Sequence, residues 1–421
     1  MKLGRPISLI LLAVFIFVGC TEENDITTIT FNIGRDPTAA HQKIIQQFEE
    51  DYPHIRVQIV ESPQDASLQH DLYVTRFAGK DESIDVIAID VIWTAEFARA
   101  GWLRPLDDLA EELPMDDFLP GPIEACTYRD TLYAMPWFTD AGLLYYRKDL
   151  LNEYGFDEPE TWDELKEIVT TIRQDQPHLS GFLIQAEQYE GLITNVMEFL
   201  WSHGADVWDE TGRWQIATPE AEEALQRLID FILVDNITPR GVLTFQEEES
   251  RHVFQDGRAI FLRNWPYVWE LANNPATGSK VVGNIGIAPV PGKNPDLRAA
   301  TLGGWNLGIS SYSEHPEESW KLIRYFMEYD QMKQFSIDGG RLPTRISLYK
   351  DDDILERSPY FEDLYEVFIN ARPRPVTPHY SQISDIMQVS IHRALLGRIT
   401  VREALERIDA EVQAMFDRYG R

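Results

Sequence analysis

The amino-acid sequence predicts an α/β protein with more than one domain, on three observations. Predicted strands alternate with predicted helices along the first part of the chain. The strand predicted at residues 84–89 is apolar on both faces, which is typical of a parallel sheet covered by helices on both sides. The chain has 421 residues, whereas a single hydrophobic core stops growing at about 250 to 300 residues.

The first elements follow from residue periodicity and turn residues. Residues 26–33 alternate β-branched and polar side chains and end at Gly34, which predicts a strand. Apolar residues at helical spacing predict a helix over 41–52, which Pro53 ends. A strand over 55–60 and a helix over 68–77, closed by Gly79, precede the apolar strand at 84–89.

The rest of the chain repeats these patterns. Strands are predicted at 142–146, 259–262, 281–290 and 302–309. Helices are predicted over 148–154, 161–172, 192–203, 219–233, 316–329, 360–369 and 383–419, and a shorter segment over 250–257. Thr161 and Glu164 form the capping-box pattern that opens the second of these helices.

The first twenty residues have the features of an export signal. Lys2 and Arg5 precede an apolar stretch over 9–18, which is too short to span a bilayer because that takes about 20 residues. Gly19 and Cys20 resemble the lipobox of bacterial lipoproteins, although Phe17 stands where that family usually has leucine. The resemblance implies a signal peptide over 1–19, an acylated Cys20 and a tether over 20–28. The alternative is an ordinary signal peptide that ends near a cysteine.

Composition argues against several classes of partner and site. The net charge of −31 at pH 7 repels nucleic acid and anionic lipid head groups. Two cysteines give no disulfide framework, and Cys126 reads as a small buried hydrophobe. The nine histidines lack metal-ligand spacing and no phosphate-binding loop is present, so no metal, cofactor or catalytic residue is expected.

Six segments, in this order, carry a resemblance to a known family. They are residues 84–90, 142–151, 159–165, 257–261, 303–309 and 339–345. Together they resemble the extracellular solute-binding proteins of carbohydrate ABC importers, in particular the trehalose- and maltose-binding branch. The resemblance implies a two-lobed periplasmic-binding-protein fold with discontinuous lobes. It also implies a ligand cleft between the lobes that closes over a sugar. The protein would be a monomer that delivers this sugar to the permease of an ABC transporter in the membrane.

The resemblance also implies that the chain passes between the lobes more than once. We expect these passages near residues 138–141, 283–287 and 327–332. Lobe 1 then comprises residues 26–137 and 286–329, and lobe 2 comprises residues 138–285 and 330–421.

A sugar-binding cleft needs flat aromatic rings for the C–H faces of the sugar and fixed polar groups for its hydroxyls. Candidate aromatic residues lie at predicted strand ends or in the following loops, where α/β sheets bind ligands: Trp93, Trp137, Trp265, Tyr267, Trp269 and Trp305. The alternative is that such a ring packs in the core beneath a loop. We favour this alternative more for Trp269 than for Trp265 or Tyr267.

Polar candidates lie beside these rings. Asp90 follows the apolar strand, where it would accept hydrogen bonds from a sugar, although it could instead cap the next helix. Asp140 lies at the first predicted passage, where the resemblance implies a sugar contact and the alternative is a hinge hydrogen bond. Gly303 and Gly304 leave backbone N–H groups open to a ligand beside Trp305, unless they form a tight turn around a core tryptophan.

Two further candidates rest mainly on the resemblance. An arginine near residues 372–375 reaches the ligand in the resembling branch, and we choose Arg374, with Arg372 as the alternative. Asp36, after the first strand, is a possible polar contact, but it could also cap the helix that follows.

Two other functions remain open at this point. A glycoside hydrolase also combines aromatic rings with paired carboxylates, for which Asp90 and Asp140 would be the candidates. Against it, eight strand–helix repeats are not evident. A binding protein for peptides, polyamines or iron could use the same fold. The aromatic residues and the resemblance favour a neutral sugar, and we expect a glucose-containing disaccharide such as trehalose or maltose.

Overall fold

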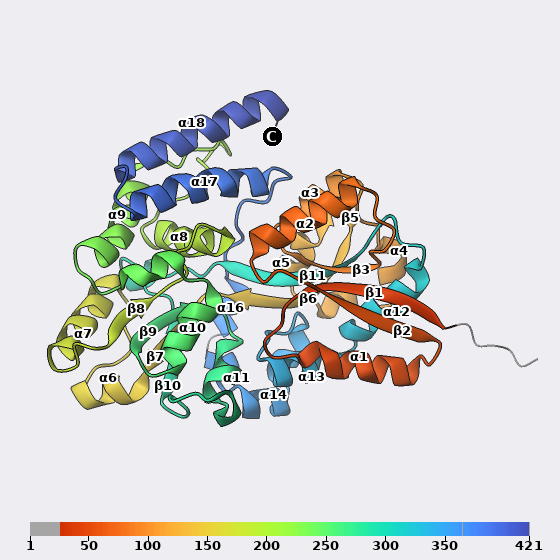
Figure 1. Cartoon of the computed structure of the whole chain (residues 1–421), viewed down its shortest axis with the longest axis horizontal. Coiled ribbons are helices and arrows are strands. Elements are labelled where there is room, and N and C mark those ends of the chain that lie inside the picture. The colour runs from red at the N-terminus through yellow and green to blue at the C-terminus, as the bar shows by residue number, and fades with distance from the viewer. Residues whose placement is uncertain (1–25, 364, 421) are drawn as a thin grey trace, which may run out of the picture.

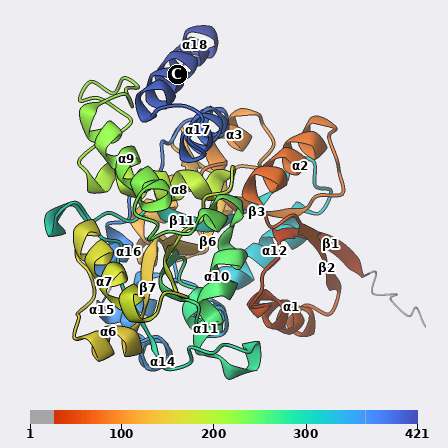
Figure 2. The same cartoon turned by 60° about the vertical axis from the view of Figure 1, so that its left-hand side comes forward.

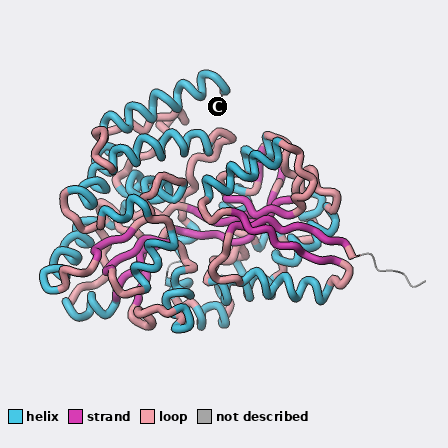
Figure 3. The backbone as a smooth tube through the Cα atoms, viewed as in Figure 1, coloured by secondary structure: helices cyan, strands magenta, loops and turns pink. Residues whose placement is uncertain are grey.

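The computed structural model describes residues 26–363 and 365–420 as two α/β lobes, each built on its own sheet (Figure 1). The export signal, Cys20 and most of the tether lie outside the described residues. Figure 3 shows the strands gathered in two groups, each with helices around it. The predicted α/β class and two-lobed fold are therefore confirmed.

The first sheet has the strand order β2-β1-β3-β11-β6. Its strands are β1 (Thr27–Gly34), β2 (Ile55–Ser62), β3 (Val86–Asp90), β6 (Ala134–Ala141) and β11 (Leu302–Ile309). The parallel arrangement predicted for the first unit is confirmed, because β1 pairs parallel with β2 and β3. β11 runs antiparallel between β3 and β6, so the complete sheet is mixed.

The second sheet has the order β10-β7-β9-β8. Its strands are β7 (Leu143–Arg147), β8 (Ser180–Leu183), β9 (Ala259–Asn264) and β10 (Ile285–Pro289). β7 is antiparallel to β9 and β10, and β8 is parallel to β9. A small ribbon of β4 (Thr127–Tyr128) and β5 (Thr131–Leu132) precedes β6.

Helices cover both sheets (Figures 1 and 2). Those around the first sheet are α1 (Ala40–Asp51), α2 (Ala66–Ala78), α3 (Thr94–Arg99), α4 (Asp107–Ala110), α5 (Pro120–Ala125) and α12 (Pro316–Met327). Those around the second are α6 (Lys148–Tyr154), α7 (Trp162–Asp175), α8 (Glu190–Ser202), α9 (Pro219–Leu233), α10 (Glu247–Gln255), α11 (Val268–Asn273), α17 (Tyr380–Leu395) and α18 (Val401–Tyr419). The remaining helices are α13 (Tyr329–Gly339), α14 (Asp352–Arg357), α15 (Tyr360–Asp363) and α16 (Tyr365–Ile369).

Most predicted elements are present, and the bounds of α6, α9 and β11 match the prediction. The predicted capping box at Thr161 and Glu164 is also present. Cys126 is fully buried, as predicted, and burial raises the pKa of its thiol.

Four predicted segments differ from the structure, and in three of them a local backbone change interrupts the segment. The strand predicted over 281–290 is shortened to β10, since Gly283 adopts a left-handed conformation with φ 74°. The helix predicted over 316–329 ends at Met327, because Glu328 is extended, and α13 then starts at Tyr329. Residues 360–369 form two short helices, and Gly397, with φ 69°, separates α17 from α18.

Three chain segments pass side by side between the two sheets. The first is Gly142, between β6 and β7, whose N–H donates to the Thr301 carbonyl at 3.3 Å. The second is residues 290–301, between β10 and β11. The third contains Arg372, whose N–H donates to the Ala300 carbonyl at 2.8 Å and whose carbonyl accepts from the Leu302 N–H at 2.8 Å.

All three expected passages therefore differ from the structure. Residues 138–141, expected as the first passage and as the start of lobe 2, belong to β6 of the first sheet. Residue 286, an expected lobe limit, falls inside β10, which pairs with β7 in the second sheet. The other expected passage, at 327–332, is the joint between α12 and α13, and α13 packs against α1 and α12. An apolar β-branched segment has the same pattern whether it pairs within a sheet or crosses between sheets, so periodicity does not locate the passage expected at 283–287.

Candidate ligand-binding site

A cleft lies between the lobes, where the edge of the first sheet faces α8, α10 and the loop after β9. Its space, including the open mouth, is about 1020 Å³. All nine residues predicted as ligand contacts line it: Asp36, Asp90, Asp140, Trp265, Tyr267, Gly303, Gly304, Trp305 and Arg374. The fold thus brings together residues separated by more than three hundred positions in the sequence.

Trp305 and Trp265 are the half-buried tryptophans of this cleft. Trp305 lies opposite Asp90 in the β3–β11 pairing, and Trp93 packs against its ring edge at a centroid distance of 5.5 Å. The guanidinium of Arg263 lies 4.1 Å from the Trp265 ring centroid. Both indoles are therefore held by protein neighbours in fixed orientations.

The other aromatic candidates divide between the cleft wall and the core. Trp137 lines the cleft and stacks on Phe335 at 4.9 Å. Trp93 is 2% exposed and does not line the cleft. Trp269 packs on Tyr360 at 5.1 Å, also outside the cleft lining, which agrees with the core role favoured for it.

Gly303 and Gly304 are needed for close approach, but they form no tight turn, because both lie within β11. A Cβ atom on Gly304 would lie 2.5 Å from the Phe138 carbonyl oxygen, and its φ of 125° disfavours any other residue. A Cβ atom on Gly303 would lie 2.9 Å from the Trp265 ring. The two glycines thus let Trp265 and β6 approach β11 closely.

Arg374 joins the two lobes at the buried end of β3. Its Nη2 donates to Asp90 Oδ1 at 3.1 Å, and its Nη1 donates to Glu190 Oε1 at 2.6 Å. Glu190, the first residue of α8, also accepts hydrogen bonds from the hydroxyls of Tyr380 and Ser384. Arg374 is 3% exposed. Arg372, the alternative in the prediction, instead pairs with Asp206 outside the cleft lining.

A second arginine, Arg341, holds the opposite side of the cleft. Its Nη2 donates to Asp36 Oδ1 at 3.3 Å, and its Nη1 lies 3.8 Å from Asp140 Oδ2. Its guanidinium lies over the rings of Phe138, at 4.7 Å, and Tyr267, at 4.9 Å. Arg341 therefore contacts groups from both lobes.

The contacts of Asp36 suit an anchor for Arg341 rather than a free ligand group. It accepts hydrogen bonds from the N–H and hydroxyl of Thr38 and from His41. Burial would raise the pKa of Asp36, but the hydrogen bonds from His41 and Thr38 and the charge of Arg341 outweigh burial and lower it. Asp36 therefore stays ionised and keeps Arg341 in place.

The buried carboxyl group of Asp140 has fewer polar partners than that of Asp36. It is 5% exposed, and its Oδ1 has no hydrogen-bond partner within the described residues. Burial raises the pKa of Asp140 to about 7, because Arg341 and Arg263 only partly offset the loss of water. Asp140 Oδ1 is thus a buried acceptor without a protein partner in the cleft wall, and a ligand donor reaches it only if the side chains around it shift.

The sequence prediction missed several residues of the cleft wall. The polar and aromatic ones that matter for its chemistry are Tyr189, Glu190, Glu247, Phe335 and Arg341. Arg341 lies in one of the segments that carried the family resemblance, so its position could have been found there. The others start helices or lie inside one, and nothing in their local pattern distinguishes them from ordinary helix residues.

Metal binding has no support in the part of the chain that the structure describes. No group of three or more His, Cys, Asp or Glu side chains there could hold a metal ion. Across the same residues, no helix is both long and apolar enough to cross a membrane.

The model for bacterial extracellular solute-binding proteins matches residues 34–333. This chain belongs to that family. A probable ABC transporter-binding protein of Deinococcus radiodurans is 35% identical over 368 residues, covering 85% of this chain and 86% of that protein. Family membership implies export to the periplasm or to the cell surface.

Solved structures agree with the fold. Maltose-bound MalE3 of T. maritima is 42% identical, with a TM-score of 0.89 over 92% of this chain and 100% of that chain. A solute-binding protein of Thermotoga lettingae bound with alpha-D-tagatose is 26% identical, with a TM-score of 0.84 over 92% of this chain and 99% of that chain. The family and these relatives are binding proteins rather than enzymes, which sets aside the hydrolase alternative.

The raised pKa of Asp140 predicts how stability depends on pH. Between its ordinary value of 3.8 and about 7, the folded protein holds this proton while the unfolded chain releases it, so stability falls as pH rises. In Asp140→Asn this loss is absent. We expect the unfolding free energy of Asp140→Asn, relative to the unchanged protein, to rise by on the order of 3 kcal/mol from about pH 5 to about pH 8.

Urea unfolding without ligand at both pH values measures this difference. Asp108→Asn, at an exposed position on α4, is the control for removing a carboxylate. Equal pH dependence of Asp140→Asn and the unchanged protein would contradict the assignment.

Proposed function

We propose that this protein binds a neutral sugar in the cleft, specifically a glucose-containing disaccharide such as trehalose or maltose. The observation that carries the proposal is a set of buried polar atoms without protein partners beside aromatic rings. Asp140 Oδ1, Arg341 Nε and Arg374 Nε belong to this set among the described residues, and all three residues line the cleft. A buried atom of this kind costs about 1 to 3 kcal/mol if it stays unpaired.

A sugar suits this arrangement chemically. A hydroxyl group donates one hydrogen bond and accepts others, so neighbouring hydroxyls can serve a carboxylate acceptor and a guanidinium donor together. The ring faces of Trp305 and Trp265 supply flat apolar surfaces for sugar C–H groups.

Charge pairing favours a neutral ligand over an anionic one. Arg374 is already paired with Asp90 and Glu190, and Arg341 with Asp36 and Asp140. Since each buried guanidinium is matched by carboxylates, an anionic ligand would find no free cation at these positions.

The relatives support a sugar of this size. The MalE3 structure, 42% identical to this chain, contains maltose, while the T. lettingae relative holds a monosaccharide, alpha-D-tagatose. The higher identity to the maltose-bound protein favours a disaccharide.

Delivery follows from the two-lobed fold. In the proposal, sugar contacts from both lobes stabilise the closed form, and the permease of an ABC transporter recognises that form. The protein acts as a monomer. Its lobe boundaries lie near residues 142, 290–301 and 372. The acyl chain on Cys20 keeps the protein near the permease.

A thermal-shift screen tests the proposed ligand. A ligand at about 100 times its dissociation constant adds about 2.7 kcal/mol to the stability of the form that binds it. We expect maltose or trehalose to raise the melting midpoint, and amines, amino acids and iron chelates to leave it unchanged. Protection by a charged solute without protection by any sugar would overturn the proposal.

Replacing Trp305 tests the proposed stacking. Trp305→Ala should weaken disaccharide binding by about 5-fold or more, because loss of a stacking ring costs about 1 to 3 kcal/mol. Trp269→Ala removes an equally half-buried tryptophan outside the cleft lining and should leave the affinity unchanged. Calorimetric titration gives both dissociation constants. Equal weakening by the two variants would show a general loss of structure and contradict a contact at Trp305.

The lipid anchor has its own test. Cells that express the full chain and are fed a labelled fatty acid should incorporate the label into this protein, and Cys20→Ala should abolish it. The control is Cys126→Ala, which keeps Cys20 and should keep the label. Label on the Cys20→Ala protein would contradict acylation at this residue.

A further inference from the structure

The start of α10 holds the two aromatic residues of the loop after β9. The indole Nε1 of Trp265 donates to Glu247 Oε1 at 3.4 Å, and the hydroxyl of Tyr267 donates to Glu248 Oε1 at 2.7 Å. Arg251, one turn further along, forms an ion pair with Glu248. Two successive residues of a single helical turn thus fix the polar ends of both rings.

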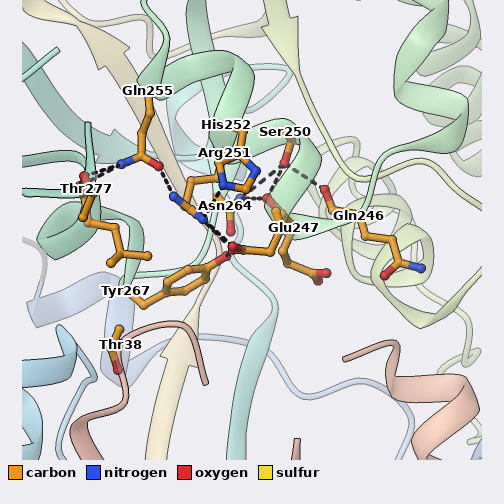
Figure 4. A network of polar contacts seen from close by, with 12 residues as sticks. Thr38, Gln246, Glu247, Ser250, Arg251, His252, Gln255, Asn264, Tyr267 and Thr277 are labelled. Atoms are coloured by element: carbon orange, nitrogen blue, oxygen red, sulfur yellow. Dashed lines mark hydrogen bonds and ion pairs between the residues drawn. The ribbon is translucent and has the colours of Figure 1, made fainter. Parts of the chain in front are cut away.

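The backbone of this loop is tied to the same turn. Asn264 Nδ2 donates to the Glu247 carbonyl at 3.1 Å, and Asn264 Oδ1 accepts from the Trp265 N–H at 2.8 Å. Figure 4 shows this network around Asn264, Arg251 and Tyr267. Any displacement of the α10 start therefore displaces Trp265 and Tyr267 as well.

The residue that precedes Glu247 reaches across to the other lobe. Gln246 Nε2 donates to Asp65 Oδ2 at 2.7 Å. Asp65 follows β2 of the first sheet and caps α2, because its Oδ1 accepts from the Leu68 N–H at 2.9 Å. In Figure 4 the Gln246 amide points away from Arg251 and Tyr267. The same side chain also takes part in the capping box of α10 with Glu249.

The hydrogen bond between Gln246 and Asp65 lies at the rim of the cleft, beside the ligand space. Gln64, Ala66 and Glu247, the sequence neighbours of the pair, line the cleft, whereas Asp65 and Gln246 do not. The pair therefore joins the two lobes without occupying a ligand-contact position.

We propose that Gln246 is a positioning residue for sugar binding: its hydrogen bond to Asp65 fixes the α10 start, and with it Trp265 and Tyr267, when the lobes are closed. The inference rests on the proposed sugar-binding function. Opening the lobes separates Gln246 from Asp65, so the hydrogen bond contributes to the closed, ligand-bound form and not to the open form.

Stopped-flow measurements on the full chain with maltose test the inference. If the unchanged protein does not bind maltose, the neutral sugar that protects it best replaces maltose as the probe. Gln246→Ala should release the sugar about 3- to 10-fold faster, the effect of one lost hydrogen bond. Its association rate should stay unchanged, because the contact with Asp65 exists only after closure, whereas loss of the α10 cap that the Gln246 side chain also supplies lowers the melting midpoint without ligand.

Two further variants make the test specific. Gln226→Ala removes a glutamine whose Nε2 bonds Asp230 within α9, and its release rate should equal that of the unchanged protein. Gln246→Glu places a second carboxylate against that of Asp65. Because the two charges repel, this variant should release the sugar at least as fast as Gln246→Ala. Adding Asp65→Asn to Gln246→Glu exchanges the amide and the carboxylate, keeps a good helix cap, and should restore slow release.

Each remaining outcome decides against the inference. Unchanged release from Gln246→Ala, or no restoration in the double variant, would overturn it while sugar binding by the unchanged protein upholds the proposed function. If the unchanged protein binds no neutral sugar, the proposed function fails, and this inference fails with it.

Discussion

The buried ion pairs of Arg374 with Asp90 and Glu190 are the contact on which the rest of the site depends. One guanidinium joins the carboxyl end of β3 to the first turn of α8, and so joins the two lobes at the bottom of the cleft. Removing one partner of such a pair leaves an uncompensated buried charge, at a cost of about 3 to 5 kcal/mol. The lobes are therefore joined here by charge as well as by the three chain passages.

This charge pairing also determines the chemistry left for a ligand. The arginines are matched by carboxylates, and Asp36 is saturated by Thr38, His41 and Arg341. What remains unpaired is a set of single atoms, such as Asp140 Oδ1 and Arg341 Nε, near the rings of Trp305 and Trp265. A neutral polyhydroxyl ligand satisfies such atoms one by one without introducing a net charge into the cleft.

Local patterns predicted the strands and the helices better than the passages between lobes could be predicted. Periodicity and caps located α6, α9 and β11, because those signals are confined to a few residues. They could not show that β10 pairs with β7, or that residues near Arg372 run beside Ala300, because both facts depend on distant segments. Glu190 was missed for the same reason: its role appears only when Arg374 is brought to the start of α8.

The position of the hydroxyl groups of a bound sugar tests the proposed site most directly. The measurement is the distance from Asp140 Oδ1 to the nearest sugar oxygen in a crystal structure of the protein with maltose or trehalose. The account predicts a hydrogen bond of about 2.5 to 3.0 Å, with a sugar ring against Trp305. A sugar bound elsewhere, or one in the cleft with Asp140 Oδ1 still unpaired, would contradict it.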